Sequence, residues 1–306
     1  MKEKKITSLI RELEDQLRSV YEDAHLCEQY AWWTLEAITH TSKAALMSRE
    51  TITFTNDTHK KLTDWMDKLI NEKMPIQYLI GWVPFGDLKI LVEPPVLIPR
   101  PETEEWVINL IKQLKTLQNK SLTILDICSG TGCIALALAK ALPQATIIAT
   151  DISEKAIELG KKNAKHNNVT NVTFVESDLF NELATNKLFD LIVGNPPYIS
   201  FAEFQELDDS VTTWEDAQAL VAEDNGRAII DAIVEVTPDY LEQNKEMEQK
   251  KIPQLILEIG YTQGHKVADF FASCDFIDVK VLKDLEGKDR VVCGRLGNVI
   301  TPFMAE

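Results

Sequence analysis

Apolar residues recur at helical spacing through the first 70 residues of the chain. Ile6–Tyr21 places its apolar side chains on one stripe with charges opposite, and Ala24–Thr39 forms a second helical stretch. A third helix is predicted after a polar break, with Asn56 or Asp57 as its N-terminal cap. Residues 1–73 are therefore predicted to form a small N-terminal helical bundle. The pattern fits a substrate-docking module and a structural cap equally well.

Short β-like runs replace the helical pattern in residues 74–98. The runs 76–81 and 88–92 predict a β-hairpin that links the bundle to the rest of the chain. Directly after it, Arg100 stands between two prolines, which hold its guanidinium on a stiff extended loop. Arg100 and Glu102 are candidates for substrate binding, and the alternative is that they pair with each other in a structural corner.

Strands and helices alternate from residue 122 onward, which predicts a parallel sheet covered on both faces. Residues 99–306 are expected to form this α/β domain, closed by a C-terminal β-hairpin over residues 276–293. The polar stretch 242–251 is expected to be a solvated extension before the last parallel strand. The parallel strands are predicted near residues 122–127, 146–151, 172–176, 188–194 and 254–259.

Composition narrows the class of protein. The 306 residues carry 32 Lys+Arg against 48 Asp+Glu, a formal net charge of −16, which argues against a surface that tracks nucleic-acid phosphates. The five cysteines form no C-x-x-C pair, so neither a metal site nor a disulfide framework is predicted. With no apolar run of membrane-spanning length and no signal-peptide pattern, a cytoplasmic location is expected.

A glycine-rich turn follows the first predicted parallel strand. Cys128, Ser129, Gly130, Thr131 and Gly132 lie between that strand and an apolar helical run. A turn of this kind lets the backbone approach a ligand closely, with helix N–H groups facing it. One G-x-G is a weak signal by itself, but the strand–turn–helix setting strengthens it.

The next two strand ends carry acidic residues. Asp151 lies about twenty residues after Gly130, where a Rossmann-type fold places a carboxylate for ribose hydroxyls; its alternative role is to cap the following helix. Asp178 could accept from an adenine amino group while Leu179 packs on the ring. Cys133 stands where a dinucleotide site needs its third glycine, which excludes a dehydrogenase and favours a nucleoside cofactor without phosphate.

The fourth parallel strand ends in Asn195, Pro196, Pro197 and Tyr198. Two successive prolines make the turn stiff and leave its carbonyl groups free to accept hydrogen bonds. Ligands bind beyond the carboxyl ends of strands in such sheets. The turn is therefore predicted to hold a planar group that presents an NH₂, with Asn195, Pro196 and Tyr198 at the reaction centre and Pro197 in the substrate site.

The chain resembles the peptide chain release factor N5-glutamine methyltransferases, the HemK/PrmC family. The resemblance covers residues 75–295 and rests on Gln77-Tyr78-x-x-Gly81, Ile98-Pro99-Arg100-Pro101-Glu102-Thr103-Glu104, Asp126-x-x-x-Gly130-Thr131-Gly132-Cys133, Asp151-Ile152-Ser153, Ser177-Asp178-Leu179-Phe180, Asn195-Pro196-Pro197-Tyr198-Ile199, Leu257-Glu258-Ile259-Gly260 and Gly287-Lys288-Asp289-Arg290-Val291. Cys128 departs from the pattern, because the family usually has glycine there.

The resemblance implies a Rossmann-like class I methyltransferase with a seven-stranded, mostly parallel sheet. Its cofactor would be S-adenosyl-L-methionine and its substrate the glutamine of the Gly-Gly-Gln motif in a release factor, docked by residues 1–73. Asn-Pro-Pro-Tyr also occurs in adenine-N6 DNA and RNA methyltransferases, and ribosomal-protein glutamine methyltransferases are related. The Pro-Arg-Pro-Glu-Thr loop, residues 99–103, favours release factors over ribosomal proteins. The acidic charge and the absence of a recognisable target-recognition domain count against the adenine-N6 enzymes.

Overall fold

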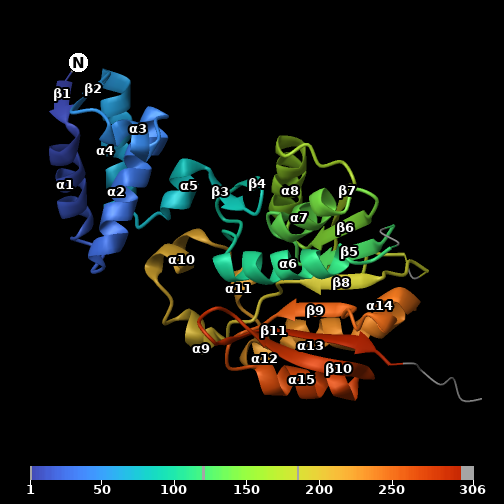
Figure 1. Ribbon diagram of the computed structural model, residues 1–306. Coiled ribbons are helices and arrows are strands. Elements are labelled where there is room, and N and C mark those ends of the chain that lie inside the picture. Colours follow the sequence, from blue (N-terminus) through green and yellow to red (C-terminus); the bar gives the residue numbers. More distant parts are fainter. Residues whose placement is uncertain (1, 119–120, 185, 298–306) are drawn as a thin grey trace, which may run out of the picture. The chain divides into compact units, whose positions relative to one another are not determined.

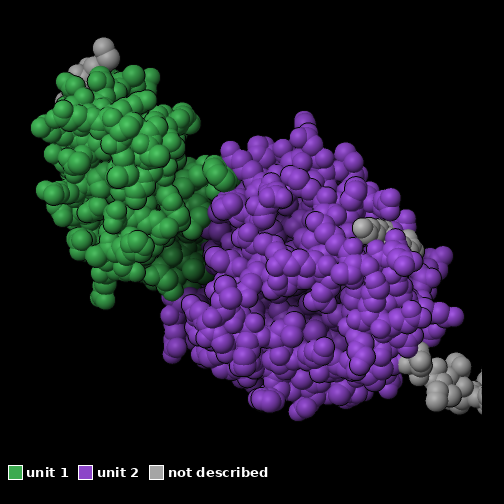
Figure 2. All heavy atoms as spheres, viewed as in Figure 1, with its two compact units in different colours: residues 1–82, 208–214 green, residues 83–207, 215–306 purple. Residues whose placement is uncertain are grey.

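The chain divides into two compact units (Figure 2). The computed structural model describes residues 2–118, 121–184 and 186–297. Unit 1 comprises residues 1–82 together with 208–214, and unit 2 comprises residues 83–207 and 215–306. The chain therefore leaves unit 2 after Leu207, contributes one short helix to unit 1, and returns at Glu215.

Unit 1 is mainly helical, as the periodicity predicts. Three longer helices pack on one another, and a short antiparallel strand pair joins the first residues to the segment before the third long helix. Its elements are β1 (Lys2–Lys5), α1 (Ile6–Leu17), α2 (Ala24–Thr39), α3 (Lys43–Met47), β2 (Thr51–Phe54), α4 (Asn56–Ile70), α5 (Ile76–Ile80) and the inserted α10 (Asp209–Trp214).

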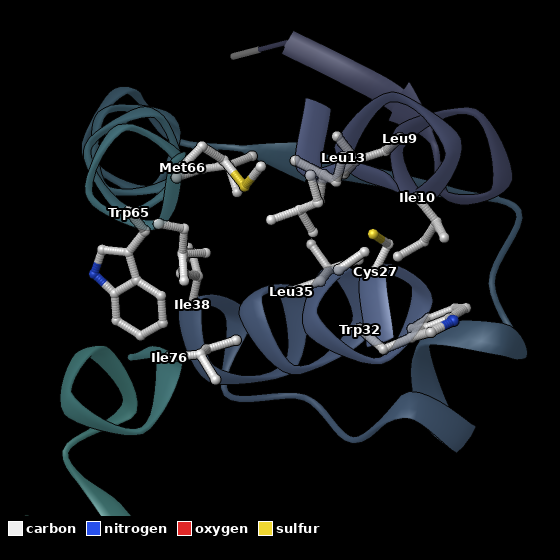
Figure 3. Packing of buried hydrophobic residues seen from close by; sticks show 14 of the residues in the cluster. Leu9, Ile10, Leu13, Cys27, Trp32, Leu35, Ile38, Trp65, Met66 and Ile76 are labelled. Carbon is white, nitrogen blue, oxygen red and sulfur yellow. The ribbon is translucent and has the colours of Figure 1, made fainter. Parts of the chain in front are cut away.

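The core of unit 1 is formed by the apolar stripes of α1, α2 and α4. Figure 3 shows Leu13 of α1, Leu35 of α2 and Met66 of α4 directed toward a common centre, where each is buried. Thr55 caps α4 by accepting from the Thr58 N–H at 3.1 Å. The predicted caps, Asn56 and Asp57, are wrong by one and two residues, because Thr55 is the residue whose extended backbone aims its hydroxyl at the first turn.

The predicted hairpin is displaced along the chain. Residues 76–80 form the short helix α5 rather than a strand, and Gly81 ends this helix with a φ of +85°, in the left-handed conformation. The hairpin itself consists of β3 (Trp82–Phe85) and β4 (Leu88–Leu91). Its turn contains Gly86 at a φ of +56°.

Unit 2 contains a seven-stranded sheet in the order β10-β11-β9-β8-β5-β6-β7. Strands β5 to β9 are parallel, and β11 runs antiparallel to both β9 and β10, so the predicted closing hairpin is confirmed. The strands are β5 (Thr123–Ile127), β6 (Thr146–Asp151), β7 (Val172–Glu176), β8 (Leu191–Gly194), β9 (Leu255–Glu258), β10 (Phe276–Lys283) and β11 (Asp289–Leu296).

Helices cover both faces of this sheet (Figure 1). One face carries α6 (Pro101–Leu114), α7 (Cys133–Ala141) and α8 (Glu154–His166), and the other carries α13 (Ala228–Val236) and α15 (Gly264–Ser273). Shorter helices occupy the loops: α9 (Phe201–Phe204), α11 (Ala217–Leu220), α12 (Glu223–Gly226), α14 (Lys245–Gln249) and the 3₁₀ turn Thr237–Tyr240. The predicted α/β fold with a mostly parallel seven-stranded sheet is confirmed.

The polar stretch 242–251 is more than a solvated extension. It contains α14, whose Met247 is fully buried. Asn244 caps this helix and also donates to Asp190 Oδ1 at 2.6 Å. The sequence pattern did not predict this helix, because a single apolar residue anchors an otherwise charged segment and one residue gives no periodicity.

Candidate active site

The turn between β5 and α7 has backbone angles that favour glycine. Gly130 and Gly132 have φ values of +53° and +78°, in the left-handed region. The Ser129 N–H donates to the Thr150 carbonyl at 2.9 Å, and the Gly130 N–H donates to Asp151 Oδ2 at 2.8 Å. These two bonds hold the turn against the carboxyl end of β6.

Cys128 begins this turn with a φ of +59°. A side chain in the left-handed conformation costs about 1–2 kcal/mol, which explains why a glycine is the easier residue there. Burial raises the pKa of the Cys128 thiol, and the negative charges of Asp151 and Asp126 raise it further. The thiol is therefore neutral at pH 7, and Cys128 contributes a small apolar side chain to the turn.

Asp151 accepts two backbone hydrogen bonds, one on each carboxylate oxygen. Besides the bond from Gly130, its Oδ1 accepts from the Ser153 N–H at 2.9 Å. Ser153 is the cap of α8, so the capping role considered for Asp151 is wrong. Burial raises the pKa of Asp151, opposed by these two N–H donors. A carboxylate offers about four lone-pair sites, so two remain for further donors such as a pair of ribose hydroxyls.

The end of β7 supplies a second acid and an apolar neighbour. Asp178 is exposed, while Leu179 is half-buried and takes a φ of +50°. Ser177 donates from its hydroxyl to the Leu179 carbonyl at 3.0 Å and so fixes the strained residue. Strained backbone of this kind concentrates at ligand sites.

A cavity of about 190 Å³ lies at these strand ends. Six of the predicted cofactor residues line it: Cys128, Gly130, Asp151, Asp178, Leu179 and Asn195. Its other walls come mainly from the loop before α6 and from the segment around α11: Pro95, Val96, Leu97, Thr150, Ile152, Ser153, Ala156, Ser177, Pro197, Asp216, Gln218, Ala219, Val221 and Ile229. The walls are largely apolar, with carboxylates from three different strand ends or loops.

Three predicted cofactor residues lie beneath the cavity rather than in its wall. Ser129, Thr131 and Gly132 are buried in the turn itself. Gly132 has a packing role, because a Cβ there would press on the ring of Phe174. These three residues are therefore not among those that line the cavity.

The Asn195–Tyr198 turn follows β8 at the same edge of the sheet. Asn195 and Pro197 line the cavity, Pro196 is buried, and Tyr198 is half-buried. Burial and the nearby carboxylate of Glu258 raise the pKa of the Tyr198 hydroxyl, which stays protonated. The turn thereby presents an amide side chain at the cavity wall and a neutral phenol beside it.

Arg100 and Glu102 do not pair with each other. Arg100 Nη2 donates to both oxygens of Glu215, at 2.8 and 2.7 Å, and Glu215 is buried. Glu102 lies in the first turn of α6 and lines a smaller cavity together with Trp106 and Arg290. The structural corner considered from the sequence therefore exists, but its acid is Glu215, more than a hundred residues away along the chain.

Three buried polar residues hold the Asn195–Tyr198 turn and were given no role in the sequence analysis. Gln263 donates from Nε2 to the Tyr198 carbonyl at 2.9 Å, Thr103 accepts from Asn195 Nδ2 at 3.3 Å, and Glu258 accepts from the Tyr198 hydroxyl at 3.4 Å. Glu258 could have been recognised from the sequence, because it is an acid at the carboxyl end of the fifth parallel strand. No feature of the sequence points to Gln263.

The hydrogen-bond acceptors and apolar walls of the cavity fit an adenosine-type cofactor. Asp151 has acceptor capacity for a ribose, Asp178 and Leu179 offer an acceptor and an apolar surface, and the backbone at Gly130 carries no side chain. The sheet order and the ligand edge at the strand carboxyl ends are those of a doubly wound fold. The fold and site together define an S-adenosyl-L-methionine-dependent class I methyltransferase.

Comparison with known proteins places the chain within a family. Residues 109–243 match the model of the Methyltransferase small domain. The release factor glutamine methyltransferase of Lactococcus lactis is 39% identical over 86% of this chain and 92% of its own length, and that of Streptococcus pneumoniae is 34% identical over 94% and 97%. The chain belongs to the release factor glutamine methyltransferase family.

Comparison with a solved structure confirms the fold alone. The hMettl16 catalytic domain, in complex with MAT2A 3′UTR hairpin 6, superposes with a TM-score of 0.51 at 16% identity, over 83% of this chain and 86% of that one. Identity at this level supports the shared architecture of sheet and helices and says nothing of substrate.

Neither a membrane span nor a metal cluster is found in the described part of the chain. Over residues 2–118, 121–184 and 186–297, no helix is long and apolar enough to cross a membrane. The same residues contain no group of three or more His, Cys, Asp or Glu side chains arranged to hold a metal ion.

Proposed function

We propose that this enzyme methylates the side-chain amide nitrogen (N5) of the glutamine in the Gly-Gly-Gln motif of a peptide chain release factor. The observation that carries the proposal is the stiff Asn195–Tyr198 turn in the wall of the cofactor cavity. S-adenosyl-L-methionine is held by the cavity residues, with Asp151 on the ribose and Asp178 and Leu179 at the adenine. When bound, it supplies an electrophilic methyl group on sulfur.

The chemistry explains the choice of residues in the turn. An amide nitrogen is a poor nucleophile, because its lone pair is delocalised into the carbonyl, and positive charge develops on it during attack. Acceptors placed for that state lower the barrier selectively. Asn195 Oδ1 and the Pro196 carbonyl accept the two N–H bonds of the glutamine, Pro197 shapes the pocket, and the ring of Tyr198 packs on the amide plane.

A Gly-Gly-Gln tripeptide suits this stiff pocket. Two glycines beside the reacting side chain let the substrate backbone follow unusual φ/ψ angles and leave no bulky neighbours to meet Pro197 or Tyr198. The enzyme itself is acidic, with a formal net charge of −16. That charge favours a basic, ribosome-associated partner.

Residues 1–73 are proposed to dock the release factor. The loop that follows the Asn195–Tyr198 turn supports this, because it supplies α10 to unit 1. There Trp214 Nε1 donates to the Glu72 carbonyl at 2.8 Å, and Lys73 pairs with Asp209. A partner bound to unit 1 would thus contact chain that is covalently continuous with the catalytic turn.

The test is methyl transfer to purified release factors. Incubation with labelled S-adenosyl-L-methionine and mapping of the peptides by mass spectrometry should show one methyl, on the glutamine of Gly-Gly-Gln, and none after Gln→Ala at that position in the factor. Asn195→Ala should lower kcat by roughly two to three orders of magnitude, the scale for one transition-state hydrogen-bond partner.

A matched control keeps the result specific. Asn171 donates to three backbone carbonyl oxygens and lies outside the cavity lining, so Asn171→Ala removes the same side chain without touching the site. It should leave kcat near the wild-type value. Methylation spread over several glutamines, or found only on nucleic acid, would overturn the proposal.

A further inference from the structure

Glu258 is a buried acid whose presence the cofactor cavity does not explain. It is the last residue of β9, its exposed fraction is 0%, and it is absent from the lining of the cofactor cavity. A carboxyl group in such a place is costly unless its oxygens accept several hydrogen bonds. Its partners therefore indicate what it does.

Three side-chain donors converge on Glu258. Thr103 donates from Oγ1 to Oε2 at 2.7 Å, Trp106 donates from Nε1 to the same oxygen at 2.9 Å, and the Tyr198 hydroxyl lies 3.4 Å from Oε1. Burial raises the pKa of Glu258, and these donors together with the positive charge of Arg290 oppose the rise. Thr103 and Trp106 come from one turn of α6, so helix and strand are joined through this carboxyl group.

The direction of the Thr103 hydrogen bond follows from its acceptor. An ionised carboxylate has no hydrogen to donate, so Glu258 Oε2 accepts from the Trp106 indole N–H and from the Thr103 hydroxyl alike. The single hydroxyl hydrogen of Thr103 is used in the hydrogen bond to Glu258. Only lone pairs of Oγ1 then face Asn195.

The orientation of the Asn195 amide follows from that direction. Asn195 approaches Thr103 Oγ1 with Nδ2 at 3.3 Å, which is long for a hydrogen bond. Orientation does not depend on the strength of this contact, because the reverse orientation would set Oδ1 against the lone pairs of Oγ1. With Nδ2 turned toward Thr103, Oδ1 is the atom left to accept from an incoming amide.

We propose that Glu258 is a positioning residue, which acts through Thr103 to keep Asn195 Oδ1 directed at the substrate nitrogen. The inference rests on the acceptor role proposed above for Asn195. A reversed Asn195 would present an NH₂ group to the NH₂ of the substrate, so the acceptor would be lost although every residue of the turn remained. Through Oε1 the same carboxyl group also faces Tyr198, at the other end of the turn.

The first test removes the acceptor for the Thr103 hydroxyl. Glu258→Met keeps a side chain of similar length without an acceptor oxygen, so the Thr103 hydroxyl can donate to Asn195 Oδ1 instead and turn the amide. The variant should lose about tenfold to a hundredfold in kcat, less than the roughly two to three orders of magnitude expected when the acceptor itself is removed. Its Kd for S-adenosyl-L-methionine should stay within about twofold.

Two substitutions at Thr103 test the relay itself. Thr103→Val removes the hydroxyl with little change of shape and should reduce kcat to a similar degree, whereas Thr103→Ser keeps the hydroxyl and should stay within a few-fold of wild type. Asp190→Leu is the control for replacing a partly buried carboxylate by an apolar side chain. Asp190 accepts from the Thr123 N–H at the opposite end of β8, so its replacement should affect melting temperature without affecting kcat.

A double-mutant cycle separates positioning from general destabilisation. If Glu258 acts through Asn195, Glu258→Met placed in an Asn195→Ala background should cost less than about twofold more, since there is no amide left to orient. Full additivity of the two losses, or equal activity of Thr103→Val and Thr103→Ser, would overturn the proposal. Should Glu258→Met fail to fold, the Thr103 pair decides.

The result of the double-mutant cycle does not depend on which substrate the enzyme methylates. It is measured on whichever acceptor the wild-type enzyme methylates. Absence of methyl on the Gly-Gly-Gln glutamine, with methyl found on another acceptor, would overturn the proposed function, and the additivity of the two substitutions would still decide the role of Glu258.

Discussion

Replacing Arg100 by methionine should destabilise unit 2 by leaving the buried acid of Glu215 without its charged partner. The side chain of Glu215 is 1% exposed and that of Arg100 is 33% exposed. Removing one partner of a fully buried pair costs about 3–5 kcal/mol. Because one Arg100 nitrogen bridges both oxygens and the guanidinium is partly in water, we expect a loss of about 2–3 kcal/mol, below that range.

The loss should depend on pH. Burial raises the pKa of Glu215, and Arg100 opposes that rise, so Arg100→Met raises the pKa further. A carboxyl group with a raised folded-state pKa stabilises the protein below its unfolded value, and that contribution is lost as pH rises through the folded value. The difference in stability between variant and wild type should therefore be small near pH 4 and widen toward pH 7.5.

Urea unfolding of wild type and Arg100→Met at several pH values measures this difference. Adding Glu215→Gln removes the isolated charge, so the double variant should recover most of the loss at pH 7.5. If Arg100→Met were as stable as wild type, or if Glu215→Gln brought no recovery, the structural role would be refuted. A fall in kcat/KM at unchanged stability would instead support the substrate-binding role predicted from the sequence for Arg100.

Three further substitutions test other parts of the site. Asp151→Ala should weaken S-adenosyl-L-methionine binding by about 1–3 kcal/mol, because a charged hydrogen-bond acceptor is lost. If calorimetry showed unchanged affinity, the role of Asp151 would be limited to its hydrogen bond with the Gly130 turn. Burial raises the pKa of Asp126 to about 8, so its stabilising contribution is complete below about pH 4 and is lost as pH rises through 8. Asp126→Asn should flatten the dependence of unfolding free energy on pH, by at most about 1.4 kcal/mol per unit, and an unchanged slope in urea titrations would contradict this. Gly226→Ala should lower the melting temperature by several degrees, because φ is +82° and a Cβ would overlap the Tyr198 carbonyl oxygen; a scanning-calorimetry midpoint within about a degree of wild type would argue against that overlap.

Much of the fold was predictable because it depends on local pattern. Helices α1 and α2 and the five parallel strands lie where periodicity places them, within a few residues. The displaced hairpin shows the limit: the short apolar run Ile76–Ile80 fits a strand or a helix, and periodicity over five residues does not separate the two. Likewise, the burial of Met247 depends on what packs over it.

For the candidate site, the sequence by itself determined the residues that sit at strand ends. Cys128, Asp151, Asp178 and Asn195 meet in one cavity because the carboxyl ends of parallel strands share an edge, so their positions along the chain imply their proximity. The direction of each hydrogen bond, and the separation of wall residues such as Gly130 from buried ones, needed coordinates.

Only the tertiary structure decided which buried acids meet the Arg100 loop and the Asn195–Tyr198 turn. Glu215 meets Arg100 and Glu258 meets Thr103 across more than a hundred residues of chain, and no spacing rule reaches that far. Each of these acids is buried, so its ionisation and its role depend on the donors that folding brings to it rather than on its neighbours in sequence. The sequence thus shows which residues are available for the chemistry. The packing of α6 against β9, together with the loop at Glu215, decides how the side chains of these residues are oriented.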